Sequence, residues 1–197
     1  MRRFPSKILL SLCAVAVTAS VLTPIVLACV RPRTLDEQML MAGDEVVVGR
    51  VVSIDERMAP EANGESVLWT VVRFHADESL VTNRRDADLT FFFRGGIRPG
   101  SPTTTITPHA DDIREGRHLL LFLAKRPFGE QRFGAGVFQV DSYAEVYRVM
   151  DFRDSSGVAQ EVVLGNGGGF ALEQQDYIVN VRARVADAAA KAKKIGK

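Results

Sequence analysis

The sequence predicts a mainly β domain built as a small closed barrel, with a short helix before the barrel and an amphipathic helix after it. Several segments rich in β-branched and aromatic residues are separated by stretches of Gly, Pro, Asn and Asp, a pattern typical of strands. None of these segments alternates cleanly, and several are apolar on both faces. Such strands fit a small barrel covered on part of its outside better than a flat two-layer sandwich.

The predicted strands follow one another from residue 46 to residue 164. Gly49 lies inside the first of them, where it permits the bend or bulge that a barrel corner needs. A polar segment at 154–157 predicts a hairpin turn between the last two strands. The strands are predicted at 46–52, 67–74, 89–93, 119–123, 137–140, 143–152 and 158–164.

Two helices are predicted, one at each end of the strand region. Thr34 and Glu37 have the spacing of a capping box, so a short helix should follow and end at Gly43, burying Leu35 and Met39. Near the C-terminus apolar residues recur every three or four positions, which predicts a helix over about 171–195. Its apolar face consists of Ile178, Val181, Val185, Ala188, Ala192 and Ile195, whereas its last turns are rich in lysine.

The N-terminus has the features of an export signal. Residues 8–28 contain no charge, and Arg2, Arg3 and Lys7 precede them. A basic region, an apolar region and a small residue at the boundary predict a signal over residues 1–28 and one domain over 29–197. Three interpretations remain open at this point: a lipoprotein, a soluble secreted protein cleaved after Ala28, or an uncleaved membrane anchor.

Cys29 favours the lipoprotein among these three. Residues 26–29 resemble the lipobox of bacterial lipoproteins, in which the cysteine is acylated and becomes the first residue of the mature chain. The chain has two cysteines, and Cys13 would leave with the signal, so Cys29 would have no intramolecular partner. We therefore expect a lipid anchor on Cys29 that holds the protein at the cell envelope; otherwise it would be periplasmic or extracellular.

The charge of the domain excludes one class of function. Between Cys29 and Ala190 the chain carries 18 basic and 24 acidic residues, a net charge of −6. Nucleic-acid binding usually requires a basic face. We expect no nucleic-acid partner.

Motifs for catalysis, cofactors or phosphates are absent from the sequence. No G-x-S-x-G, G-x-G-x-x-G or P-loop pattern occurs. The histidines, His75, His109 and His118, lack the close spacing of zinc ligands, so we expect those in strands to be solvent-facing or hydrogen-bonded. The sequence therefore predicts no catalytic residue, metal site or cofactor.

The order of elements resembles a known fold. Residues 43–53, 88–96 and 113–123 are similar to a group of uncharacterised exported bacterial proteins, and loosely to the netrin-module and tissue-inhibitor-of-metalloproteinase domains. This resemblance covers about residues 29–150 and implies a five-stranded OB-type barrel. Those inhibitors chelate zinc through a Cys-x-Cys terminus, whereas here Arg31 stands in place of the second cysteine of that motif. From this resemblance we expect the OB-like barrel in this chain, but not the inhibitor function.

The connection between the strands at 89–93 and 119–123 is the predicted binding surface. It is longer than most connections in compact domains, and long connections are often functional. Its candidate partner-binding residues are Arg94, Arg98, Thr103, Thr105, His109, Asp111 and Asp112. The sequence thus favours an exported, non-enzymatic binding domain that contacts an envelope protein. Two alternatives remain: a metal-assisted hydrolase, in which His109, Asp111, Asp112 and His118 would converge, or a purely structural envelope protein.

Overall fold

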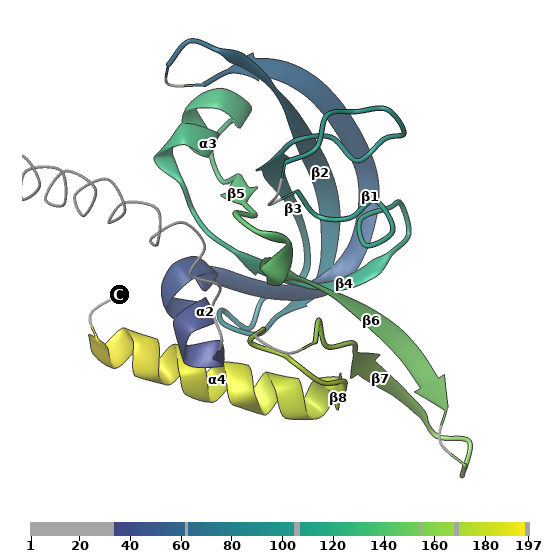
Figure 1. Cartoon of the computed structure of the whole chain (residues 1–197). Helices are drawn as coiled ribbons and strands as arrows, with labels where there is room; N and C mark the ends of the chain where they lie inside the picture. Colours follow the sequence, from purple (N-terminus) through teal and green to yellow (C-terminus); the bar gives the residue numbers. More distant parts are fainter. Residues whose placement is uncertain (1–33, 62, 105–106, 154, 168–169, 196–197) are drawn as a thin grey trace, which may run out of the picture. The chain divides into compact units, whose positions relative to one another are not determined.

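The computed structural model describes residues 34–195, except 62, 105–106, 154, 168 and 169 (Figure 1). The predictions for the export signal and for Cys29 lie outside the described residues. The fold is mainly β, with helices before, within and after the strands. The elements are α2 (Leu35–Ala42), β1 (Glu45–Pro60), β2 (Ser66–Ser79), β3 (Arg85–Arg94), β4 (His118–Leu123), α3 (Pro127–Phe133), β5 (Phe138–Gln139), the 3-10 helix η2 (Tyr143–Glu145), β6 (Val146–Arg153), β7 (Ala159–Val163), β8 (Asp176–Tyr177) and α4 (Ile178–Ile195).

Eight strands form one curled sheet in the order β5-β3-β2-β1-β4-β6-β7-β8. Neighbouring strands are antiparallel except β3 and β5, which are parallel. The long strands β1 and β2 bend strongly, as Figure 1 shows, and β1 changes register between Val48 and Gly49. A Cβ on Gly49 would lie 2.0 Å from the carbonyl oxygen of His75, so this close approach requires glycine. The predicted bend at Gly49 is confirmed.

The predicted closed barrel is not observed. The sheet is a half-barrel whose outer strands, β5 and β8, do not pair with each other. A single bridge joins the chain after β4 to β5, with Ala124 N donating to Gln139 O at 3.0 Å and Gln139 N to Ala124 O at 2.7 Å. A full ladder does not form here, because β5 has only two residues and the chain before it forms α3.

The core explains why the predicted strands are apolar on both faces. In β1, Val46 and Val48 contribute to the cluster that contains residues of α2 and α4, whereas Val47 and Val51 contribute to the cluster inside the half-barrel. In β4, Leu120 and Leu119 divide between the two clusters in the same way. The central strands are therefore covered on both sides, as the sequence predicts.

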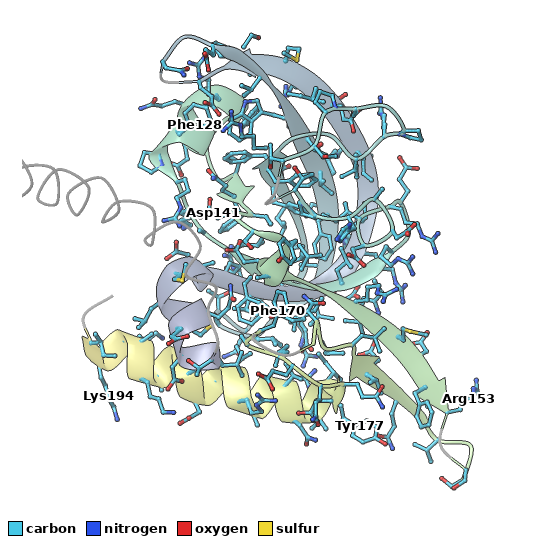
Figure 2. All side chains as sticks on the ribbon, viewed as in Figure 1. Phe128, Asp141, Arg153, Phe170, Tyr177 and Lys194 are labelled. Carbon is cyan, nitrogen blue, oxygen red and sulfur yellow. The ribbon has the colours of Figure 1, made fainter. Side chains whose placement is uncertain are left out.

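The terminal helices pack together against the sheet (Figure 1). The capping box of α2 is confirmed, with Thr34 N and Glu37 N each donating to the other residue's side chain at 3.2 Å. The C-terminal helix begins at Ile178 rather than near residue 171, because Asp176 and Tyr177 pair with β7. Lys194 points away from α2 near the end of α4 (Figure 2). None of the helices in the described part of the chain has the length and apolar character needed to cross a membrane.

Candidate functional site

The predicted binding loop runs from Arg94, at the end of β3, to the start of β4, and Glu56 on β1 fixes its first turn. The Glu56 carboxylate accepts hydrogen bonds from Ile97 N at 2.7 Å, Arg98 N at 2.8 Å and Ser101 Oγ at 2.6 Å. Burial acts to raise the pKa of Glu56, but these hydrogen bonds and the charge of Arg98 outweigh it and lower that pKa. An ionised carboxylate therefore holds this turn at neutral pH.

Thr107 fixes the middle of the loop. Its buried hydroxyl donates to Arg94 O at 2.9 Å and accepts from Thr104 N at 2.8 Å. Gly95 N donates to Leu68 O at 2.8 Å, which attaches the beginning of the loop to β2. The described residues of this connection thus have a defined shape but form no strand or helix.

Several predicted partner-binding residues already contact the domain itself. Arg94 Nε lies 3.1 Å from Glu61 Oε1, and an Arg98 nitrogen donates to Ile54 O at 3.1 Å. Thr103 is exposed, whereas Thr105 lies outside the described residues. The two arginines therefore help to hold the loop in place.

The acidic end of the loop does not form a metal centre with His118. Asp112 pairs with Arg148 of β6 at 3.4 Å, and the ring of His109 lies 6.4 Å from that of Tyr143. Asp111 is exposed. Among the described residues, the one group of His, Cys, Asp and Glu side chains that could hold a metal ion joins His118 to different partners. The convergence expected for the hydrolase alternative is not observed.

That group consists of His118, Asp151 and Glu161, with Asp77 and Arg50 beside it. Asp151 and Glu161 face each other across the β6–β7 ladder, and Arg50 faces His118 across the β1–β4 ladder. Asp77 is the extra residue of the bulge in β2, since Val48 pairs with Glu78 and Gly49 with Ala76. Bulges reorient side chains in this way. Five strands thus contribute to one cluster.

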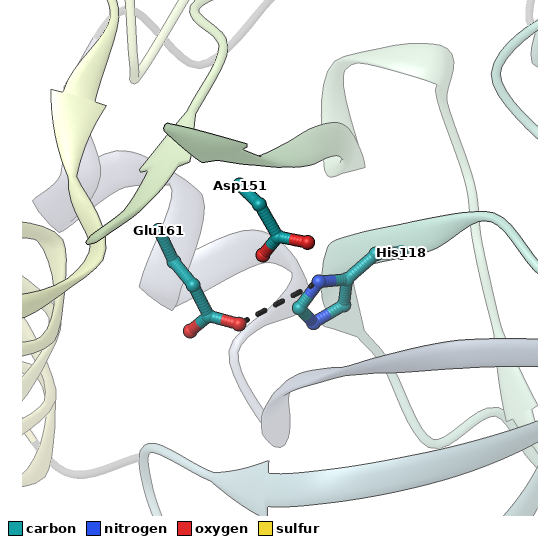
Figure 3. Close-up of side chains that lie close together, drawn as sticks. All are labelled: His118, Asp151 and Glu161. Atoms are coloured by element: carbon teal, nitrogen blue, oxygen red, sulfur yellow. Dashed lines mark ion pairs between the residues drawn. The ribbon is translucent and has the colours of Figure 1, made fainter. Parts of the chain in front are cut away.

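The imidazole of His118 lies between carboxylates. Its Nδ1 lies 3.7 Å from Glu161 Oε1, and its Nε2 lies 3.5 Å from Asp77 Oδ2. Figure 3 shows the carboxylates of Asp151 and Glu161 on the same side of the ring. The candidate ligand atoms of His118, Asp151 and Glu161 all lie within 4.8 Å of one another. These distances exceed those of ordinary hydrogen bonds, so the side chains lie close together without hydrogen bonds between them.

Burial controls the charge of His118, whose side chain is 6% exposed. Desolvation lowers its pKa, and Arg50 lowers it further, while Glu161, Asp77 and Asp151 act in the opposite direction. The imidazole is therefore neutral at pH 7, and its two contacts with carboxylates are not ion pairs. A neutral imidazole has a nitrogen lone pair that can accept a proton or bind a metal.

Sequence reasoning missed this cluster and misjudged one of its members. His75 is hydrogen-bonded to Asp88 at 2.9 Å, as expected of a strand histidine. His118 is neither solvent-facing nor satisfied, because its buried Nε2 has no hydrogen-bond partner. Asp151 and Glu161 carry no sequence signal, since they lie in β6 and β7, 33 and 43 residues after His118, and meet it only through sheet pairing. Searches with protein-family models, among curated proteins and among solved structures found no match to this chain.

Proposed function

We propose that this protein is an exported, non-enzymatic binding domain, anchored by lipid on Cys29, that contacts another protein of the cell envelope. The leader-like pattern of residues 1–28 and the lipobox-like position of Cys29 support the location. The net charge of −6 between Cys29 and Ala190 argues against a nucleic-acid partner. The ordered loop after β3 supports the binding role.

We also propose that the curled part of the sheet is an OB-like half-barrel. Antiparallel pairing of β1 with β2 and β4, and of β2 with β3, supports this assignment. In addition, β3 pairs in parallel with β5, and a bridge joins Ala124, just after β4, to Gln139 in β5. These contacts complete the strand neighbours of a five-stranded arrangement of β1 to β5. This topology is in keeping with the resemblance to netrin modules.

The observation that carries the binding role is the anchoring of the loop by Glu56. Three hydrogen bonds to one carboxylate fix a turn that has no regular secondary structure. A loop already fixed in its bound shape loses less conformational entropy when a partner binds. The exposed side chains of this loop include Thr103, His109 and Asp111, which suit polar recognition of a protein surface.

Alanine substitutions at Thr103, His109 and Asp111 together test this role. None of the three side chains is buried, so the domain should remain folded. A matched control carries alanine at the exposed residues Arg85, Gln131 and Lys194. After cross-linking in the native envelope, the loop variant should lose a protein adduct that the wild type and the control retain. An adduct equally strong in all three proteins would place the binding surface elsewhere.

A further inference from the structure

We propose that His118, Asp151 and Glu161 form a binding site for a divalent transition-metal cation, best suited to Zn²⁺, in which Asp77 orients His118. Their candidate ligand atoms lie within 4.8 Å of one another. Tetrahedral ligands of Zn²⁺ at about 2.0–2.2 Å from the metal are separated by about 3.4 Å. Small side-chain movements would therefore bring these atoms into the first coordination shell.

The required movements are available to the carboxylates but not to the imidazole. The side chain of Glu161 is 40% exposed, and Asp151 is exposed, so both can change rotamer without disturbing the core. His118 is buried and lies in the paired part of β4. The site thus has one fixed nitrogen ligand and two adjustable oxygen ligands (Figure 3).

The unpartnered nitrogen of His118 is a second, independent observation. Nε2 is buried and makes no hydrogen bond, which is costly for a polar atom. Asp77 Oδ2 lies 3.5 Å from it, whereas Glu161 Oε1 lies 3.7 Å from the other ring nitrogen, Nδ1. A histidine that binds a metal usually donates its other N–H to a carboxylate, which fixes the ring and its tautomer. Binding through Nδ1 would leave Nε2–H for Asp77.

The charge around the imidazole also matches a divalent cation. Asp77, Asp151 and Glu161 bring three carboxylates to the site, opposed by the nearby guanidinium of Arg50. Among the described residues, neither Asp151 nor Glu161 has an ion pair with a lysine or arginine. A dipositive ion would neutralise the excess negative charge at this point of the sheet.

The ligand types select the class of metal. Ca²⁺ takes six to eight oxygen ligands and Mg²⁺ retains several waters, so neither gains from an imidazole. One nitrogen and two carboxylate ligands suit Zn²⁺, with a fourth position open to water or to an anion. The site connects β4 to the β6–β7 ladder, so an ion bound there would join these strands.

Titration of the full chain, purified in detergent, with Zn²⁺, Ca²⁺ and Mg²⁺ tests the site by calorimetry. The controls are Asp88→Asn, which alters the separate His75–Asp88 pair, and Glu161→His, which keeps a metal-binding side chain. Wild type and both controls should bind one Zn²⁺ at this site, and Glu161→Gln and Asp151→Asn should lose that binding. Asp77→Asn should weaken it about 10- to 100-fold, as loss of an orienting partner does. Ca²⁺ and Mg²⁺ should not compete with Zn²⁺ for this site.

Co²⁺ provides a readout that reports on the metal itself. Tetrahedral Co²⁺ should give visible absorption bands with the wild type and Glu161→His, and Glu161→Gln should lack them. The ring resonances of His118 should shift in the same titration. Absence of Zn²⁺ binding at millimolar concentration, or binding that persists in both Glu161→Gln and Asp151→Asn, would overturn the proposal. Equal binding of Ca²⁺ would overturn the choice of a transition metal.

Discussion

Glu145 accepts a hydrogen bond from the backbone N–H of Asp141, with its Oε2 2.8 Å from that nitrogen, and is buried at the end of η2. Arg126 pairs with the Asp141 carboxylate at 2.6 Å, so the chain on either side of β5 is joined by polar contacts. Burial raises the pKa of Glu145 to about 8, although the amide of Asp141 and the charge of Arg126 act to lower it. A buried carboxyl group is therefore protonated at neutral pH.

The stability of the domain should decrease as the pH rises from about 5 to about 8. The folded state holds the Glu145 proton more tightly than the unfolded chain, whose carboxyl has its ordinary pKa of 4.5. Unfolding in this range releases a proton, so each pH unit lowers the free energy of unfolding by at most about 1.4 kcal/mol. Glu145→Gln keeps the hydrogen-bond acceptor but removes the titration. Urea unfolding at several pH values should show the wild type losing stability relative to this variant; a constant difference from pH 5 to pH 8 would contradict protonation of Glu145.

The strands were predictable because their signal is local, whereas α3 was not. Runs such as Leu119–Leu123 contain enough apolar residues to identify a strand without knowledge of its neighbours. Helix α3 is seven residues long and contains Gly129, a poor helix former. It is stabilised by tertiary contacts, since the ring of Phe128 lies 5.2 Å from that of Trp69 (Figure 2 labels Phe128). A Cβ on Gly129 would lie 2.2 Å from Phe92, so close packing explains this glycine.

Closure of the barrel and the His118 cluster depend on pairing between distant segments. Because β5 has only two residues, its contact with the chain after β4 is a single bridge rather than a ladder, and the local pattern of residues 137–140 gives no sign of this. The proximity of Asp77 to His118 requires the bulge opposite Gly49. The sequence predicted a bend at Gly49, but not which side chain the bend would redirect. Local sequence patterns therefore predicted most of the strands and helices, whereas the candidate site depends on the register between distant strands.

Removal of α4 should unfold the domain. Ile178, Val181 and Val185 are buried in the same core cluster as residues of α2 and β4. Each such side chain contributes about 1.5–3 kcal/mol when fully buried, a large share of a typical net stability of about 5–15 kcal/mol. A chain ending at Tyr177 should show no cooperative thermal transition. A chain ending at Ala192 keeps every buried residue of α4 and should melt close to the wild type. Similar melting of both truncated chains would mean that α4 does not stabilise the fold.

Cys29→Ser should release the protein from the membrane fraction. Stable anchoring requires two or more acyl chains, and serine at this position cannot receive them through a thioether. Mass spectrometry of the native protein should identify Cys29 as the N-terminal residue with added lipid. Cys13→Ser is the control, because Cys13 lies within the predicted signal, and it should leave the membrane association unchanged. An unmodified mature chain in the medium would favour simple cleavage after Ala28.

Glu56→Ala should loosen the binding loop while leaving the half-barrel folded. The substitution removes the acceptor for Ile97 N, Arg98 N and Ser101 Oγ. Because Glu56 is only partly buried, water can replace some of these contacts, and the loss of stability should be about 1 kcal/mol. Hydrogen exchange of the Ile97 and Arg98 amides should accelerate much more than that of amides in β4. Glu65→Ala, which alters a short turn elsewhere, is the control. If the two loop amides keep their protection in Glu56→Ala, Thr107 and the backbone contacts must fix the loop without Glu56.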